Sequence, residues 1–185
     1  MALVHVTVGL FYYFLTFDVC SQAPLDDKTA RMINKAVSLG YQPGRGSIQS
    51  SADIGKWIQK LAESGDAESQ NDFGLICEMN GKKEDAFRWF EKSANQGWVE
   101  AEYNLARCYG LGIGCQKDPS KAAEIYKKSA GKGDKGSQVA LGLMYKNGYG
   151  VMKNLNEARR YFQLASEQGD GTAKAYLLEI GSKSD

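Results

Sequence analysis

Residues 105–134 read LARCYGLGIGCQKDPSKAAEIYKKSAGKGD, and residues 141–170 read LGLMYKNGYGVMKNLNEARRYFQLASEQGD. The two stretches carry the same residue types in the same order. Leu105 corresponds to Leu141, Tyr109 corresponds to Tyr145, and both stretches end in Gly-Asp. A pattern that recurs in register over a whole segment is typical of repeat proteins, whose units stack on their neighbours.

Glycines at regular intervals set the period of the repeat. They are Gly65, Gly97, Gly133 and Gly169, spaced by 97−65=32, 133−97=36 and 169−133=36 residues. A period near 34 residues fits two helices joined by two turns. The first unit lacks four residues, and we assign the difference to the glycine loop between its helices, because turns tolerate length changes.

The first helix of each unit, which we call helix A, is predicted from apolar spacing. Eight residues after each glycine comes a large apolar residue, and an aromatic residue or Cys77 follows four residues later in the first three units. This spacing places both side chains on one helix face. A small residue beside the large one allows another helix to approach closely. The large residues are Phe73, Leu105, Leu141 and Leu177.

The second helix, helix B, begins after a glycine loop in the two full-length units. Asp118 and Asn154 stand at N-cap positions, with Pro119 at the first helical position of one unit and Glu157 placed for a capping-box-like pair in the other. The glycine of the next Gly-Asp ends helix B, and the aspartate caps the following helix A.

We therefore predict an all-α protein of antiparallel helix pairs. A leader over 1–21 precedes a degenerate capping repeat over 24–64, which holds a helix over 27–39 and a glycine-rich loop over 40–50. Repeats follow over 65–96, 97–132 and 133–168, and a capping helix and tail occupy 169–185.

Composition narrows the function classes. Apolar residues make up 43% of the 185 residues and charged ones 24%, which is close to the globular average. The formal net charge is +1, so neither a nucleic-acid footprint nor a polybasic membrane patch is expected.

The first residues have the character of an export leader. Residues 1–17 contain no Lys, Arg, Asp or Glu, and the run over 8–17 is almost wholly apolar or aromatic. Such a run is shorter than a membrane span but suits a secretory signal, with cleavage after Ser21. Export to a periplasm, an endoplasmic reticulum lumen or the medium is thus expected. The alternatives are an uncleaved single membrane anchor and an amphipathic leader that packs on the first helices.

Catalysis is not expected from the residues that remain after cleavage. His5 is the only histidine, so its loss removes Ser-His and Cys-His pairs and histidine-containing metal sites. Cys77, Cys108 and Cys115 do not recur at the repeat interval. Cys108 and Cys115 are the only plausible disulfide pair, and the alternative is that all three are small buried apolar residues. We expect no metal and no cofactor.

The two matching stretches resemble Sel-1-like repeats, which are related to tetratricopeptide repeats. The resemblance covers roughly residues 50 to 180: two units match closely, 67–97 is a shortened third, and the upstream segment is a candidate fourth. It implies a right-handed α-solenoid whose A helices line a concave face. Members of this family act mainly as adaptors that hold partner proteins, and cysteine-rich exported members have been linked to binding or cleaving β-lactams.

A protein or peptide partner is therefore expected on the helix A residues. Asparagine and basic side chains in related peptide-binding repeats grip a main chain or terminal carboxylate, and exposed aromatic or apolar side chains serve as anchors. The candidates are Asn71, Tyr103, Asn104, Arg107, Leu143, Lys146 and Tyr176. The alternatives are an ordinary solvated face, a β-lactam-binding protein, and a regulatory protein that self-associates through its last helix.

Overall fold

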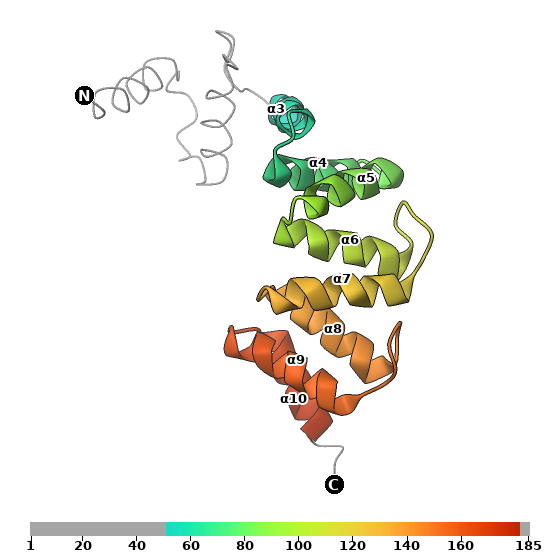
Figure 1. The fold of residues 1–185 in the computed structure, drawn as a ribbon. Helices are drawn as coiled ribbons and strands as arrows, with labels where there is room; N and C mark the ends of the chain where they lie inside the picture. The colour runs from blue at the N-terminus through green and yellow to red at the C-terminus, as the bar shows by residue number, and fades with distance from the viewer. Residues whose placement is uncertain (1–50, 182–185) are drawn as a thin grey trace, which may run out of the picture. The chain divides into compact units, whose positions relative to one another are not determined.

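The computed structural model describes residues 51–181, all of whose regular elements are helices. The predicted leader, the helix over 27–39 and the loop over 40–50 lie outside the described residues. The chain divides into two units, 1–61 and 62–185, and α3 (Ser51–Glu63) begins in the first. Within the second unit the remaining helices follow one another in antiparallel pairs (Figure 1): α4 (Ala67–Met79), α5 (Lys83–Asn95), α6 (Val99–Leu111), α7 (Pro119–Gly131), α8 (Lys135–Asn147), α9 (Leu155–Glu167) and α10 (Gly171–Gly181). The predicted all-α class is confirmed.

The Gly-Asp pairs act as both stop and start signals. At the end of α7, Gly133 has φ 93°, its N–H donates to the carbonyl of Ala130, and the N–H of Asp134 donates to the carbonyl of Ser129. These are the two hydrogen bonds of a Schellman motif. The carboxylate of Asp134 then accepts from the N–H of Ser137 at 2.6 Å and caps α8. Asp66 and Asp170 cap α4 and α10 in the same way.

Helix B also starts as predicted, except in one detail. Asp118 accepts from the N–H of Lys121, and Asn154 accepts from the N–H of Glu157 at 3.1 Å. The reciprocal half of the expected capping box is absent, because the N–H of Asn154 donates to the carbonyl of Tyr145 at 2.9 Å and the carboxylate of Glu157 pairs with Arg160.

Small residues let the two helices of a unit interlock. A Cβ on Gly142 in α8 would lie 2.6 Å from Cε1 of Phe162 in α9, a separation that real Cβ atoms do not adopt. Gly74 and Phe90 repeat this contact between α4 and α5 at the same distance. Both phenylalanines are fully buried. Residue size at this position therefore fixes how closely each helix pair packs.

The glycine loops pack against the preceding helix B. Gly150 has φ 70°, and a Cβ there would lie 2.2 Å from the carbonyl oxygen of Pro119 at the start of α7. Gly114 makes the corresponding approach to Lys83 at the start of α5. The glycines thus satisfy both a left-handed turn and a backbone contact between repeats.

The core of the second unit runs along the helix stack. Tyr109 is buried, and Tyr145 is half-buried with its ring stacked on that of Tyr161. Their inward placement confirms the helix A register. Among the helices within residues 51–181, none is long and apolar enough to cross a membrane.

Candidate functional site

The seven predicted partner-binding residues all lie on the A helices α4, α6, α8 and α10. We use the name A-helix face for these seven together with four residues at equivalent repeat positions: Leu75, Glu78, Gly110 and Glu179. The structure brings several of these side chains together in pairs that join one repeat to the next.

Asn71 and Asn104 are bonded to each other and buried. The side-chain amide of Asn104 donates to the side-chain oxygen of Asn71 at 2.9 Å, across the interface of α4 and α6. Only 5% of Asn71 and 9% of Asn104 is exposed. The expectation that these amides stand ready to grip a partner's main chain is corrected: they join adjacent repeats, because two buried amides satisfy one another there.

Arg107 is held by Glu78. Its guanidinium donates two hydrogen bonds to the carboxylate of Glu78, one A helix earlier in the chain. This bond is the main reason that the pKa of Arg107 lies above its usual range. About a quarter of each side chain is still exposed, 26% for Arg107 and 23% for Glu78. Arg107 is therefore fixed in direction while part of it still faces solvent.

Lys146 makes the matching contact at the other end of the face. Its ammonium lies 2.6 Å from the carboxylate of Glu179 on α10 and 4.7 Å from the ring centroid of Tyr176. Tyr176 in turn stacks on Phe162 with centroids 5.0 Å apart.

The two ion pairs occupy the same two repeat positions with the charges exchanged. Counted from the glycine of each unit, Glu78 and Lys146 are both thirteenth (78−65, 146−133), and Arg107 and Glu179 are both tenth (107−97, 179−169). Between the two ion pairs these positions hold Gly110 and Leu143. Along the A-helix face, two uncharged residues thus lie between two ion pairs whose acidic and basic members are exchanged.

The predicted aromatic and apolar anchors are less exposed than expected. Tyr103, Leu143 and Tyr176 are all half-buried. Tyr103 packs on Tyr126 at a centroid distance of 5.7 Å, and Leu143 packs against the core cluster around Phe162. Each of the three side chains therefore keeps only part of its surface in solvent.

Sequence reasoning missed a buried carboxylate. Glu102 on α6 is almost fully buried, and its Oε1 lies 2.7 Å from Nζ of Lys128 in the last turn of α7 and 2.8 Å from Nζ of Lys132, the C-cap residue of that helix. Because the contact depends on how α7 packs over α6, residue spacing alone gives no signal for it.

The cysteines are packing residues in this structure. Cys77, Cys108 and Cys115 are free thiols, and the first two are buried. Burial raises the pKa of Cys108 to about 12, so the thiol is protonated at neutral pH. Burial also raises the pKa of Cys77 and of Cys115. Reactive cysteines have lowered pKa values instead. The residues that the structure describes contain no cluster of three or more His, Cys, Asp or Glu side chains placed to hold a metal ion.

Known proteins share this architecture. The Sel1 repeat model matches residues 69–98, 99–134 and 136–170, and no curated protein matches the chain. A Sel1 repeat protein from Oxalobacter formigenes is 29% identical with a TM-score of 0.59, over 66% of this chain and 95% of that one.

Two further solved structures are similar. A protective antigen of uropathogenic Escherichia coli strains, which displays an SLR fold, is 29% identical with a TM-score of 0.67, over 82% of this chain and 33% of that one. Helicobacter pylori cysteine rich protein B is 27% identical with a TM-score of 0.57, over 72% of this chain and all of that one (100%). Since the three matched repeats span more than half of its length, the chain belongs to the Sel1 repeat family.

Proposed function

We propose that this protein is a non-catalytic scaffold that binds a peptide or partner protein on its A-helix face. The repeats place equivalent positions of successive A helices next to one another, as the contacts from Glu78 to Arg107 and from Lys146 to Glu179 demonstrate. A row of equivalent positions suits an extended partner, which meets one set of side chains per repeat.

The arrangement of charge on this face carries the proposal. Two ion pairs of opposite orientation flank the uncharged positions Gly110 and Leu143. Arg107 and Lys146 keep 26% and 20% of their side chains exposed although both are held by acids. A partner therefore meets charges that are already oriented, which lowers the entropy lost on binding.

Features of the described residues support a non-catalytic role. The thiol of Cys108 is buried and protonated at neutral pH, which makes it a poor nucleophile. The acidic side chains Glu78, Glu102 and Glu179 each pair with a basic side chain, so they act as structural partners in this fold.

Exchanging the charges of one ion pair tests the proposal without breaking the pair. The double variant Glu78→Lys, Arg107→Glu places in the first pair the residues that the chain itself uses at Lys146 and Glu179. The fold should tolerate the exchange, while the positive and negative charges that a partner meets at these two positions are exchanged. The wild-type chain and the double variant are immobilised side by side in the presence of cell extract, and the retained proteins are identified by mass spectrometry.

We expect one or a few proteins to be retained by the wild-type chain and lost by the double variant. Far-ultraviolet circular dichroism and a thermal melt serve as folding controls for both. If the double variant is folded and retains every protein that the wild type retains, a partner site around Arg107 is ruled out.

A further inference from the structure

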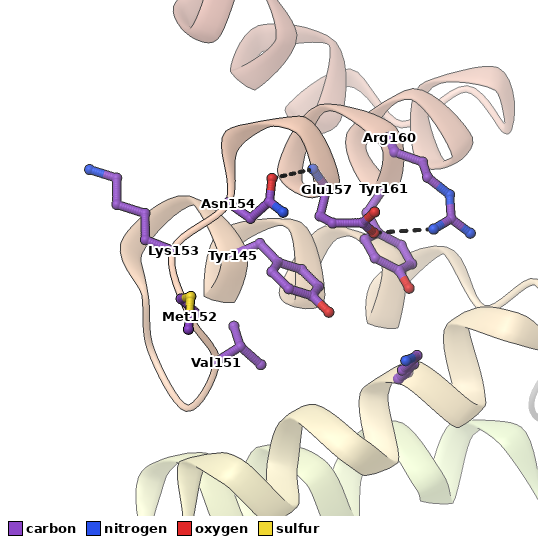
Figure 2. Close-up of a pocket in the computed structure, with 9 residues that line it drawn as sticks. Tyr145, Val151, Met152, Lys153, Asn154, Glu157, Arg160 and Tyr161 are labelled. Atoms are coloured by element: carbon purple, nitrogen blue, oxygen red, sulfur yellow. Dashed lines mark hydrogen bonds and ion pairs between the residues drawn. The ribbon is translucent and has the colours of Figure 1, made fainter.

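A pocket of about 560 Å³ lies on a different part of the molecule from the A-helix face. It is lined by residues from the end of α8, the glycine loop after it and the first half of α9 (Figure 2). Lys127 of α7 completes the lining. Its volume falls within the range of roughly 300–1,000 Å³ that is usual for ligand sites.

The wall of the pocket is aromatic and fixed. The rings of Tyr145 and Tyr161 stack with centroids 5.8 Å apart and planes inclined by 6°. Tyr161 is buried and Tyr145 is half-buried, and Val151 of the loop is also half-buried beside them. These groups offer a preformed surface for the methylene groups of a ligand.

The charged lining favours an anion. The lining contains one acidic side chain, Glu157, and three basic ones: Lys127, Lys153 and Arg160. Glu157 is neutralised by Arg160 at 3.1 Å. Lys127 and Lys153 have no ion-pair partner within the described part of the chain, and both are exposed. The lining therefore carries two unbalanced positive charges.

The preceding repeat occupies the corresponding space with its own lysine. There Nζ of Lys121 donates to the hydroxyl of Tyr109 at 2.7 Å and lies 4.2 Å from the centroid of its ring. In the third repeat Glu157 stands at the position of Lys121, and Tyr145 stands at the position of Tyr109. Glu157 turns to Arg160 instead, as Figure 2 shows, so no side chain of the described residues bonds to the hydroxyl of Tyr145.

The third unit also reverses the charge contributed by the preceding helix B. Lys127 on α7 occupies the same repeat position as Glu91 on α5, because the two residues are one full repeat of 36 residues apart (127−91). In the second unit Glu91 is near enough to raise the pKa of Lys121. In the third unit a cation faces a pocket that has lost its internal lysine.

We propose that this pocket binds an acidic side chain of a partner peptide. The ammonium of Lys127 and the hydroxyl of Tyr145 donate to the carboxylate, and the rings of Tyr145 and Tyr161 contact the methylene groups. One ammonium and one hydroxyl match the two oxygens of a carboxylate. This site is separate from the A-helix face, and the proposal for it does not depend on partner binding at that face.

The test measures binding of a dye-labelled peptide of alternating glutamate and glycine to the full chain by fluorescence anisotropy at low ionic strength. Lys127→Glu restores the residue of the preceding unit at an exposed position, and Tyr145→Phe removes a single hydroxyl. Lys135→Glu makes the same charge change at an exposed site outside the pocket and is the matched control.

We expect Lys127→Glu to weaken binding by about tenfold, Tyr145→Phe by about threefold, and Lys135→Glu by less than about twofold. The double variant Glu78→Lys, Arg107→Glu should bind the peptide like the wild type. Equal weakening by Lys127→Glu and Lys135→Glu would reduce the interaction to net charge and overturn the proposal. Tighter binding of inorganic phosphate, or of a lysine-glycine peptide of the same length, would overturn it as well.

Discussion

Arg107 reaches back one repeat and donates two hydrogen bonds to Glu78. The contact joins α4 to α6 and leaves part of both side chains in solvent. Its reversed counterpart, Lys146 with Glu179, joins α8 to α10. Charge at these positions therefore serves the stacking of repeats, and binding on this face has to make use of side chains that are already engaged.

Replacing one member of the pair should cost stability. Arg107→Glu places two carboxylates next to each other, and we expect the free energy of unfolding to fall by about 1 kcal/mol. The double variant Glu78→Lys, Arg107→Glu should recover most of that loss, because the ion pair is restored with opposite orientation. Urea unfolding of the wild type, both single variants and the double variant gives the coupling energy. A coupling energy near zero would contradict the role assigned to this pair.

Local signals predicted the fold, while contacts between repeats decided the site. The caps at Asp118 and Asp134 depend only on residues within one turn, so the sequence indicates them directly. The pairing of Asn71 with Asn104 joins residues 33 apart in the chain, and nothing near either asparagine indicates that it is buried. Exchanged charges at two equivalent positions, by contrast, indicate a contact from one repeat to the next.

The pocket was missed for a related reason. The repeat pattern consists of the residues that the two full-length units share, whereas the pocket arises where they differ, at Lys121 and Glu157. A lysine exchanged for a glutamate in otherwise matching loops indicates that one unit has lost an internal contact. The burial of Glu102 depends on α7 packing over it, which residue spacing alone does not reveal.

Gly142→Ala tests how closely α8 and α9 pack. The added methyl group would lie 2.6 Å from Phe162, which is fully buried. We expect a loss of about 1–3 kcal/mol in the free energy of unfolding, measured in urea. Gly131→Ala at the end of α7 is the control, because a Cβ there meets no atom within 4 Å. That variant should unfold at the wild-type urea concentration or slightly above it. Equal effects of the two substitutions would show that the contact with Phe162 is not limiting.

Glu102→Gln tests the buried carboxylate. The substitution keeps the shape of the side chain but removes the charge that Lys128 and Lys132 contact, and the remaining hydrogen bonds are weaker. We expect a loss of about 1–3 kcal/mol in the free energy of unfolding. Glu100→Gln on the same turn of α6 is exposed and should change it by less than about 0.5 kcal/mol. The comparison of both variants by thermal and urea unfolding separates the buried contact from the charge at the helix start. Similar losses in the two variants would argue that the contacts of Lys128 and Lys132 with Glu102 add nothing to the free energy of unfolding.

Ionisation of Cys108 should lower the stability of the fold as the pH rises in the alkaline range. Burial raises the pKa of its thiol from 9.0 to about 12 in the folded chain. Between these values the unfolded state binds fewer protons than the native state, so the free energy of unfolding falls as pH rises. The contribution is fully present below pH 9 and lost as pH approaches 12, and about 1 kcal/mol should disappear by pH 10. Urea unfolding at several pH values from neutral to pH 10, with a reducing agent present, measures this decline. Cys108→Ala should decline less steeply over the same range, whereas an identical pH dependence would mean that the thiol ionises as readily in the folded chain as in the unfolded one.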